Sequence, residues 1–352
     1  MYRLIRSILF LFPAELAHQI GIAALEILGQ LPGVCRWMRS RVRSELSVTI
    51  AGLQFPNCVG LAAGLDKNAE AVQGFYALGF GAVEVGTVTP RPQPGNPTPR
   101  LFRIPEHHAI INRMGFNNRG AQEMAARIRE LEWRPAPLGI NIGKNKDTPI
   151  SEATADYLRC VDELAELGDY VVVNASSPNT PGLRTLQEPE ALSGLLAAVR
   201  ERMPSGKPLF LKIAPDLGLE AVDAIVDVAM RCGVDGLIAT NTTIERPFEH
   251  PVAKETGGLS GEPVRSKSTA VIRRAYEHSK GKLPIIGVGG VFSAQDAYEK
   301  IRAGASLVQV YTGFIYEGPP MVPALLAGIS ELLKRDGFSS VTEAVGADAR
   351  GA

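Results

Sequence analysis

Residues 170–180 read YVVVNASSPNT, an apolar run that ends in asparagine, serine and threonine. The first four residues are apolar without alternation, which is typical of a parallel strand buried on both faces. Polar residues that follow such a strand lie at its carboxyl end, where parallel α/β proteins place their chemistry. The stretch therefore predicts a parallel sheet and a candidate site at one edge of it.

The same pattern recurs along the chain, where short apolar runs alternate with amphipathic helical stretches. We predict strands at Asn57–Ala63, Ala82–Thr89, Leu138–Gly143, Tyr170–Ser176, Leu209–Ala214, Gly236–Asn241, Pro284–Gly289 and Leu307–Thr312. We predict helices that include Ala69–Leu78, Glu152–Leu167, Ala191–Met203, Leu219–Arg231, Ser266–Ser279, Ala294–Ala303 and Val322–Lys334. Such alternation implies parallel pairing through right-handed crossovers. It predicts an α/β fold, a (β/α)8 TIM barrel, with an open doubly wound sheet as the alternative.

Several segments lie outside this minimal repeat. Residues 46–55 are typical of a β-hairpin that turns at Gly52 and plugs the amino-terminal end of the barrel. Residues 90–116 predict a loop and hairpin over the carboxyl face, and residues 243–263 form a second long excursion. We therefore divide the chain into an amino-terminal helical segment (1–45), the barrel (46–338) and a flexible tail (339–352).

Composition excludes several classes of protein. The 352 residues are 45% hydrophobic and carry no net charge, so no global basic field favours nucleic acid. The four cysteines, Cys35, Cys58, Cys160 and Cys232, are far apart, which predicts buried free thiols rather than disulfides or a metal site. We expect a monomer without a bound metal.

The amino-terminal segment has its own pattern. Residues 1–44 carry six arginines and two glutamates, a net charge of +4, and apolar residues recur at helical spacing within 4–11 and 15–29. No run approaches the length of a spanning helix, and the run at 8–12 is short for a signal peptide. An amphipathic helical pair with a basic flank predicts attachment to an anionic membrane surface. A helical cap packed on the barrel is the alternative.

Polar and glycine-rich groups stand at most of the predicted strand ends. They are Asn141, Asn174, Ser177, Lys212, Thr240-Asn241-Thr242, Gly287–Gly290 and Tyr311-Thr312-Gly313. Each alone is ordinary turn chemistry, but together they face one mouth. Glycines after the seventh and eighth strands, with Ser260-Gly261, predict a phosphate site made by backbone N–H groups.

Two lysines face the same mouth. Lys212 ends a buried strand, so its ammonium needs an anion, a developing negative charge or a buried ion pair. Lys67 follows the first strand. A Schiff-base lysine in a colourless, phosphate-binding lyase or isomerase would use the same residues, and a catalytically inert, membrane-recruited binding module is a third hypothesis.

Nine motifs identify a more specific resemblance. They are AAGLDKNAE (62–70), GTVTPRPQPGNPTPRLFR (86–103), INRMGFNN (111–118), NASSPNTPGLR (174–184), KIAPD (212–216), ATNTT (239–243), GGLSG (257–261), GVGG (287–290) and VQVYTG (308–313). In this order the chain resembles the dihydroorotate dehydrogenases, specifically their membrane-associated, quinone-reducing class (class 2).

The resemblance implies oxidation of (S)-dihydroorotate to orotate on bound FMN, in de novo pyrimidine synthesis. It implies FMN contacts from Ala63, Gly64, Leu65, Asp66, Lys67, Thr87, Asn141, Asn174, Lys212, Thr240, Gly261, Gly290, Tyr311 and Thr312. It implies substrate contacts from Lys67, Asn112, Arg113, Met114, Gly115, Phe116, Asn174, Asn179, Asn241 and Thr242. Asparagine amides both donate and accept hydrogen bonds, which suits the imide rim of orotate, and a lysine suits its carboxylate.

The resemblance makes Ser177 the catalytic base, with Thr180 and Phe116 at positions associated with its proton route. A free serine is a poor base and needs a water-poor site. The soluble class, which uses fumarate or NAD, has cysteine at this position, so Ser177 and residues 1–44 favour quinone as the oxidant.

The resemblance also implies a quinone tunnel under the amino-terminal helices, lined by His18, Arg103 and Tyr311, with Arg103 as hydrogen-bond donor. The expected oxidant is ubiquinone or menaquinone. The expected location is the cytoplasmic face of a bacterial inner membrane, as a peripheral protein.

Overall fold

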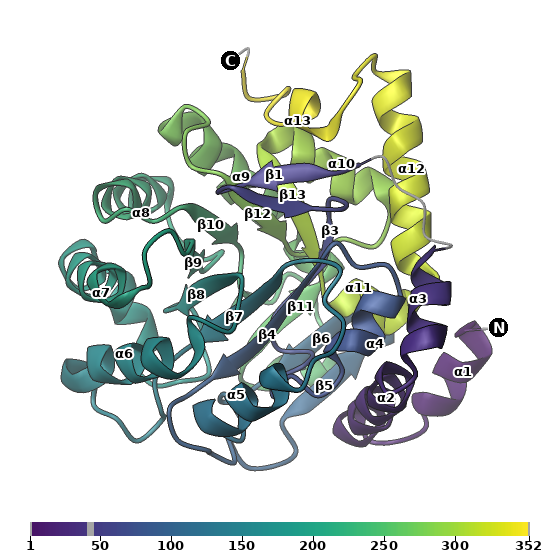
Figure 1. The fold of residues 1–352 in the computed structure, drawn as a ribbon, viewed down its shortest axis with the longest axis horizontal. Coiled ribbons are helices and arrows are strands. Elements are labelled where there is room, and N and C mark those ends of the chain that lie inside the picture. The colour runs from purple at the N-terminus through teal and green to yellow at the C-terminus, as the bar shows by residue number, and fades with distance from the viewer. Residues whose placement is uncertain (1, 41–45, 351–352) are drawn as a thin grey trace.

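The computed structural model describes residues 2–40 and 46–350, and a closed barrel of eight parallel strands forms its centre (Figure 1). Around the barrel the strands are β3 (Val59–Leu61), β4 (Ala82–Val88), β7 (Leu138–Ile142), β8 (Tyr170–Asn174), β9 (Leu209–Ile213), β10 (Gly236–Ala239), β12 (Ile285–Val288) and β13 (Ala305–Val310). The strand β13 pairs with β3 in parallel and closes the ring. The predicted barrel is confirmed, and the open doubly wound sheet is excluded.

Helices cover the outside of the barrel (Figure 1). They are α4 (Val72–Ala77), α5 (Ala121–Arg129), α6 (Ala153–Leu164), α7 (Pro189–Arg202), α8 (Leu219–Arg231), α9 (Arg265–Ser279), α10 (Ala294–Ala303) and α12 (Met321–Arg335). A short α11 (Thr312–Glu317) follows β13 directly. The helix α5 was not among the predicted helices, and its buried face rests mainly on Met124, Ala125 and Ile128 among polar neighbours.

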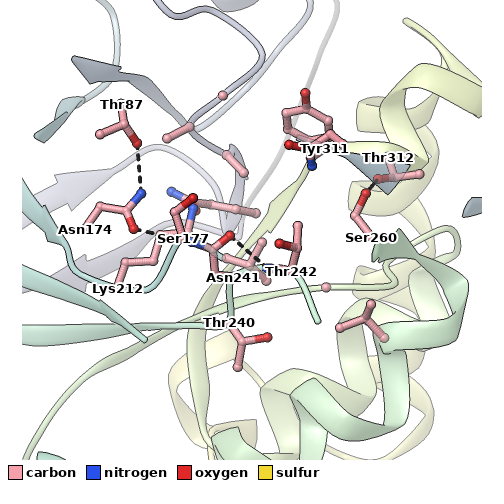
Figure 2. A pocket seen from close by; sticks show the side chains of 18 of the residues that line it. Thr87, Asn174, Ser177, Lys212, Thr240, Asn241, Thr242, Ser260, Tyr311 and Thr312 are labelled. Atoms are coloured by element: carbon pink, nitrogen blue, oxygen red, sulfur yellow. Dashed lines mark hydrogen bonds between the residues drawn. The ribbon is translucent and has the colours of Figure 1, made fainter. Parts of the chain in front are cut away.

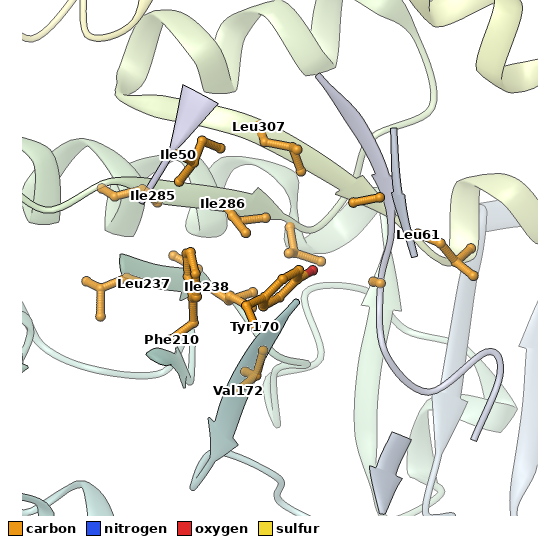
Figure 3. Close-up of a cluster of buried hydrophobic side chains, with 14 of the residues drawn as sticks. Ile50, Leu61, Tyr170, Val172, Phe210, Leu237, Ile238, Ile285, Ile286 and Leu307 are labelled. Atoms are coloured by element: carbon orange, nitrogen blue, oxygen red, sulfur yellow. The ribbon is translucent and has the colours of Figure 1, made fainter. Parts of the chain in front are cut away.

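Buried apolar side chains, with the rings of Tyr170 and Phe210 among them, fill the interior of the barrel (Figure 3). Tyr170 and Phe210 begin neighbouring strands, and their ring centroids lie 5.2 Å apart. Glycines opposite the rings make this packing possible: a Cβ on Gly139 would lie 2.2 Å from Tyr170 Cζ, and one on Gly236 would lie 2.5 Å from Phe210 Cε1. A filled floor of this kind confines open space to the carboxyl mouth.

The predicted hairpin at residues 46–55 is present as β1 (Val48–Ile50) and β2 (Leu53–Phe55), which pair antiparallel. Its buried residues Ile50 and Phe55 belong to the barrel core, and the ring of Phe55 lies 6.4 Å from that of Tyr170. The hairpin therefore packs against the aromatic floor of the barrel.

The two long excursions meet in one small sheet. Residues 90–116 contribute β5 (Leu101–Ile104) and β6 (Ala109–Asn112), and the excursion at 243–263 contributes β11 (Gly258–Gly261). The strand β6 pairs antiparallel with β5 on one side and with β11 on the other. The hairpin was predicted, but its pairing with a strand about 150 residues later was not, because nothing local in the sequence signals it.

The amino-terminal segment folds as three helices, α1 (Tyr2–Leu9), α2 (Ala14–Gly29) and α3 (Pro32–Ser40), with α2 and α3 packed on α4. Pro32 is the first residue of α3. Proline is well tolerated there, because the first residue of a helix needs no N–H for the helical hydrogen-bond pattern. Many apolar side chains predicted for helical faces are solvent-exposed, including Leu4 (69%), Ile8 and Ile27 (63%). Arg41 and Arg43 of the basic flank lie outside the described residues. Among the described residues, no helix combines the length and hydrophobicity needed to cross a bilayer.

The segment from Ser339, predicted to be a flexible tail, includes a short helix in the structure. It contains α13 (Val341–Ala344), whose Val341 and Ala344 are buried against the barrel core. Arg302 also forms an ion pair with Asp348. Two small apolar residues in a short segment gave too weak a pattern for the packing to be predicted.

Candidate active site and adjoining chamber

A cavity of about 1010 Å³ opens at the carboxyl ends of the barrel strands (Figure 2). Its lining includes, from the residues predicted for FMN or substrate, Ala63, Gly64, Lys67, Thr87, Asn112, Met114, Gly115, Phe116, Asn174, Ser177, Asn179, Lys212, Thr240, Asn241, Thr242, Gly261, Gly290, Tyr311 and Thr312. Figure 2 shows Asn174, Ser177 and Lys212 at one end and Ser260, Tyr311 and Thr312 at the other. The cavity therefore has an amide- and lysine-rich end and a glycine-rich end.

Four predicted residues do not line this cavity: Leu65, Asp66, Asn141 and Arg113. Asp66 is buried and accepts hydrogen bonds from the N–H groups of residues 68, 70 and 71, so it holds the loop after β3. Arg113 turns outward to an ion pair with Glu255 at 2.6 Å. Leu65 lines the neighbouring chamber instead. These positions act on the cavity through the backbone or through neighbours.

A buried hydrogen-bond network lies beneath the amide-rich end. Asn174 Nδ2 donates to Thr87 Oγ1 at 2.8 Å and to Asn141 Oδ1 at 3.1 Å. Asn141 Nδ2 in turn donates to Glu84 Oε1 at 2.8 Å, and Gln309 Nε2 donates to Glu84 Oε2 at 2.7 Å. The network fixes the orientation of the Asn174 amide at the wall of the cavity. Sequence reasoning missed Glu84 and Gln309, although an acid inside an apolar strand is a detectable signal.

Lys212 reaches the cavity from β9 and is 5% exposed. Burial lowers the pKa of its ammonium, and the charge of Glu84 partly opposes that shift. Within the described parts of the chain, no hydrogen bond or ion pair engages Lys212 Nζ, and the Glu84 carboxylate accepts hydrogen bonds from Asn141 and Gln309 instead. The alternative of a buried ion pair is not supported, which leaves Lys212 free to face a ligand.

The glycine-rich end is shaped for close approach by a ligand. Gly261, Gly289 and Gly290 all have positive φ angles, of 106°, 125° and 70°. A Cβ on Gly290 would lie 2.5 Å from Arg265 Cβ, and one on Gly261 would lie 2.2 Å from the His108 carbonyl oxygen. Backbone N–H groups in such loops suit an anion.

Two buried hydroxyl oxygens around the cavity have no hydrogen-bond partner among the described residues: Thr240 Oγ1 and Thr242 Oγ1. Unpaired buried polar atoms are costly and rare in folded proteins. Their grouping around one cavity indicates a ligand that carries both donors and acceptors.

The two serines after β8 have different surroundings. Ser176 is fully buried, donates to Asn174 Oδ1 at 3.1 Å and accepts from Asn241 Nδ2 at 3.0 Å. Ser177 lines the cavity, and its Oγ accepts only the N–H of Asn179, at 3.2 Å. Within the described structure the Ser177 hydroxyl therefore donates no hydrogen bond and remains uncommitted, whereas the Ser176 hydroxyl both donates and accepts one.

Lys67 lies between the active-site cavity and a polar cavity beside α2. Burial lowers its pKa to about 8, with the charges of Glu15 and Arg100 acting in opposite directions. At the same end, Asn179 Nδ2 donates to Asn112 Oδ1 at 3.1 Å. A cation and paired amides thus converge near Ser177.

A second chamber of about 720 Å³ lies beneath α1 and α2. Its lining is mainly apolar and includes all three residues predicted for the quinone site, His18, Arg103 and Tyr311. Tyr311 also lines the active-site cavity, so the two spaces adjoin at its ring. Burial lowers the pKa of His18 to about 3, with the charge of Lys67 adding to the shift, so the imidazole is neutral at neutral pH.

Arg103 is partly occupied by the amino-terminal segment. Its guanidinium donates to the carbonyls of residues 9, 10 and 12, and it lies 4.4 Å from the ring centroid of Phe10. The arginine therefore connects β5 to the end of α1 and the turn after it, in addition to facing the chamber.

Comparison with known proteins identifies the family. A family model described as dihydroorotate dehydrogenase matches residues 45–333. The chain belongs to the dihydroorotate dehydrogenase family. A relative from Myxococcus xanthus named dihydroorotate dehydrogenase (quinone) is 64% identical and covers 99% of this chain and 98% of its own length. One of the same name from Anaeromyxobacter sp. is 53% identical over 98% of this chain and 96% of its own.

A solved structure agrees with the sequence comparison. The crystal structure of the Eimeria tenella dihydroorotate dehydrogenase in complex with ferulenol has a TM-score of 0.85 and 41% sequence identity, covering 96% of each chain. The similarity extends beyond the barrel, because the family model begins at residue 45 and these full-length alignments also include the amino-terminal segment. The dihydroorotate dehydrogenase fold thus accounts for the whole chain.

Proposed function

We propose that this chain is a quinone-dependent dihydroorotate dehydrogenase of pyrimidine biosynthesis, whose barrel cavity binds FMN and dihydroorotate together. The observation that carries the proposal is Lys212, a buried ammonium that forms no hydrogen bond or ion pair within the described structure, in the same cavity as the uncommitted hydroxyl of Ser177. The family and the relatives' shared name support the same activity.

The cavity fits FMN at both of its ends. The positive-φ glycines 261, 289 and 290 would hold the phosphate through backbone N–H groups, and Thr312 and Ser260 lie beside them. Thr240 and Thr242 have buried hydroxyl oxygens that a polar ring system would satisfy. When bound, FMN would accept a hydride from dihydroorotate and make its electrons available to a quinone. Lys212 would supply a fixed positive charge where negative charge accumulates.

Dihydroorotate would bind at the amide-rich end. Asn112, Asn174, Asn179 and Asn241 offer donors and acceptors for its imide groups, and Lys67 offers a cation for its carboxylate. Asn174 and Asn179 are already held by partners, so little side-chain freedom is lost on binding. These contacts would orient C5 of the substrate toward Ser177.

Ser177 would remove the C5 proton as hydride leaves C6. Its surroundings are water-poor, since Ser177 is 6% exposed and Phe116 lines the same cavity. Thr180, the other residue of the expected proton route, is buried but does not line the cavity.

The chamber under α1 and α2 would receive the ring of ubiquinone or menaquinone beside Tyr311. Quinone reduction consumes two electrons and two protons, and Arg103 and the neutral His18 would contact the quinone oxygens. The exposed apolar faces of α1 and α2 would rest in the membrane surface, at the cytoplasmic face of a bacterial inner membrane.

A visible spectrum of the purified full-length protein tests the proposal directly. We expect flavin absorbance that bleaches on anaerobic addition of dihydroorotate and returns with a quinone analogue. A flavin that does not bleach would contradict the substrate. A colourless protein that takes up no FMN would contradict the redox function and favour a phosphate-binding lyase that uses Lys212 as a Schiff-base amine.

A further inference from the structure

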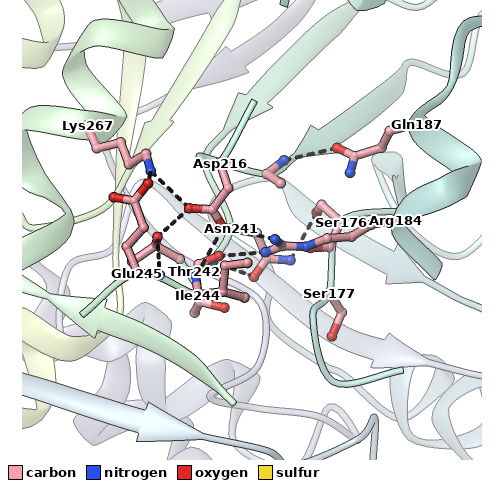
Figure 4. Close-up of polar contacts among 12 residues, drawn as sticks. Ser176, Ser177, Arg184, Gln187, Asp216, Asn241, Thr242, Ile244, Glu245 and Lys267 are labelled. Atoms are coloured by element: carbon pink, nitrogen blue, oxygen red, sulfur yellow. Dashed lines mark hydrogen bonds and ion pairs between the residues drawn. The ribbon is translucent and has the colours of Figure 1, made fainter. Parts of the chain in front are cut away.

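One arginine connects three of the strand-end loops around the active site (Figure 4). Arg184 lies in the 3₁₀ turn Leu183–Gln187, in the loop that follows β8. Its Nε donates to the carbonyl oxygen of Ser176 at 3.0 Å, and its Nη2 donates to that of Thr242 at 3.0 Å. Its Nη1 donates to Asp216 Oδ2 at 2.9 Å, in the loop after β9. The side chain therefore joins the loops after β8, β9 and β10.

Asp216 holds this arginine, and the Asp216 carboxylate is itself fixed by several hydrogen-bond donors. The carboxylate also accepts hydrogen bonds from Thr243 Oγ1, from the N–H of Ile244 at 3.1 Å and from Lys267 Nζ at 3.1 Å. Burial alone would raise the pKa of Asp216, but these donors together with Arg184 hold it below its usual value. The side chain is only 12% exposed. Asp216 is therefore ionised at neutral pH and links β9 to the start of the long excursion.

The two carbonyls that Arg184 holds belong to peptides next to active-site residues. The Ser176 carbonyl is part of the peptide that continues into Ser177, so its orientation sets the direction in which the Ser177 side chain leaves the backbone. The Thr242 carbonyl follows Asn241, whose amide contacts Ser176 Oγ at 3.0 Å. Figure 4 shows the Ser177 side chain pointing away from the arginine. Arg184 thus contacts the loop on the side away from the cavity and is not part of the cavity lining.

We propose that Arg184, anchored by Asp216, is a positioning residue that sets the orientation of Ser177 and Asn241 for proton removal from the substrate. Only a planar guanidinium can satisfy two carbonyls and a carboxylate at once in this geometry. A displacement of a reacting group by about 1 Å costs on the order of 10²-fold in rate. This inference rests on the proposed function, and it assigns a role to the final residue of the NASSPNTPGLR motif and to Asp216 of KIAPD.

A matched control stands at the opposite rim of the barrel. Arg200 Nη2 donates to Asp235 Oδ2 at 2.7 Å and its Nη1 donates to the Lys207 carbonyl, while Asp235 also accepts the N–H of Leu209 at 2.8 Å. The side chains of Arg200 and Asp235 are 29% and 39% exposed, against 23% for Arg184. Like Arg184 and Asp216, this pair joins an ion pair to backbone hydrogen bonds. It lies at the amino-terminal ends of the strands, remote from the cavity.

The test is anaerobic stopped-flow reduction of the FMN-loaded, full-length protein by dihydroorotate, in Arg184→Gln, Arg184→Lys, Asp216→Asn and the control Arg200→Gln. We expect Arg184→Gln to lower the limiting rate of flavin reduction by about 10²-fold. Reoxidation by quinone of chemically reduced flavin should stay unchanged. Asp216→Asn should have a smaller effect, because Arg184 keeps both carbonyls, and the double variant should be no slower than Arg184→Gln. Arg184→Lys should lie between wild type and Arg184→Gln.

Substrate deuterated at C5 separates positioning of the base from a general structural effect. If proton removal alone is impaired, the isotope effect from C5 should increase in Arg184→Gln relative to that from C6. Unchanged reduction in Arg184→Gln and Arg184→Lys, equal slowing of both half-reactions, or equal slowing in Arg200→Gln would overturn the proposal. If wild-type flavin itself is not reduced by dihydroorotate, the proposed function fails, whatever the variants do.

Discussion

The barrel cavity and the chamber under the amino-terminal helices adjoin at Tyr311 but differ in the polarity of their linings. The cavity is lined by amides, hydroxyls and lysines, and its polar atoms are fixed by a buried network or left facing inward without a partner. The chamber is lined mainly by apolar side chains from helices whose outer faces are themselves apolar and exposed. The first space is thus built from inward-facing polar groups, and the second from apolar ones.

This difference predicts that the two half-reactions can be impaired separately. Burial raises the pKa of Tyr311 to about 12, so the residue shared by the two spaces remains a neutral hydroxyl across the working pH range. A change in either space should therefore leave the chemistry of the other largely intact.

The largest effect is expected for Ser177→Ala. Removing the proposed base should slow flavin reduction by dihydroorotate by about 10²–10⁴-fold, while FMN remains bound. Stopped-flow absorbance under anaerobic conditions measures this rate. Chemically reduced flavin in the same variant should be reoxidised by quinone at the wild-type rate. Normal reduction of the variant would remove Ser177 as the base.

Deletion of residues 1–44 should produce the opposite pattern. It removes the helices that form one wall of the chamber, and losing even one buried apolar contact costs about 1.5–3 kcal/mol, roughly tenfold to a hundredfold in quinone affinity. Flavin reduction should be spared. Steady-state kinetics with a quinone analogue, compared with stopped-flow reduction, measure both. Equal loss of the two activities would show that the extension is structural.

Arg103→Ala should raise the quinone KM by about tenfold, because hydrogen bonds from a charged donor contribute about 1.5–3 kcal/mol. It also removes the contacts to the carbonyls of residues 9, 10 and 12. Arg103→Lys keeps the charge and isolates the contribution of the planar group. A variant whose KM for dihydroorotate rises instead would place Arg103 with the other cavity.

The pH dependence should differ between the spaces. Lys67 has a pKa lowered to about 8, so it is charged below that pH and neutral above it. Its pairing with the substrate carboxylate is therefore lost as pH rises, and kcat/KM for dihydroorotate should fall about fivefold between pH 8 and pH 9. Quinone reoxidation over the same range is the control. In Lys67→Met this dependence should disappear, and its persistence would assign it to another group.

The smallest effect is expected at the membrane face. Leu4→Ser or Leu11→Ser, at positions 69% and 84% exposed, should weaken sedimentation with anionic lipid vesicles severalfold. Leu219→Ser is the matched control, since Leu219 is 58% exposed but begins α8 on the barrel. Equal loss in all three variants would contradict a membrane-facing role for α1 and the turn after it.

The prediction of the fold succeeded where the pattern was local. Tyr170–Asn174 is apolar at nearly every position because both faces of a barrel strand are buried, and this can be read directly from the sequence. The pairing of β6 with β11 joins residues near 110 to residues near 260, and no local pattern encodes such a contact. The packing of Val341 and Ala344 was missed for the same reason.

The site was predicted through its motifs rather than through residue chemistry alone. Strand-end position was enough to bring Asn174, Ser177 and Lys212 together, because the carboxyl ends of parallel strands share one rim. It could not show that Asp66 and Asn141 support the cavity without lining it, or that Arg113 turns outward. Those outcomes depend on side-chain direction, which neighbours decide.

By itself the sequence determined the barrel, the family and most of the residues at its mouth, since strand periodicity and motif order are carried along the chain. Only the tertiary structure decided which groups remain unpaired. Glu84 accepts hydrogen bonds from Asn141 and Gln309, and none reaches it from Lys212 in the described structure. Ser176 is hydrogen-bonded to Asn174 and Asn241, whereas the Ser177 hydroxyl only accepts one N–H. Hydrogen-bond partners come from distant strands, and it is their competition in three dimensions that selects the residues left to face a ligand.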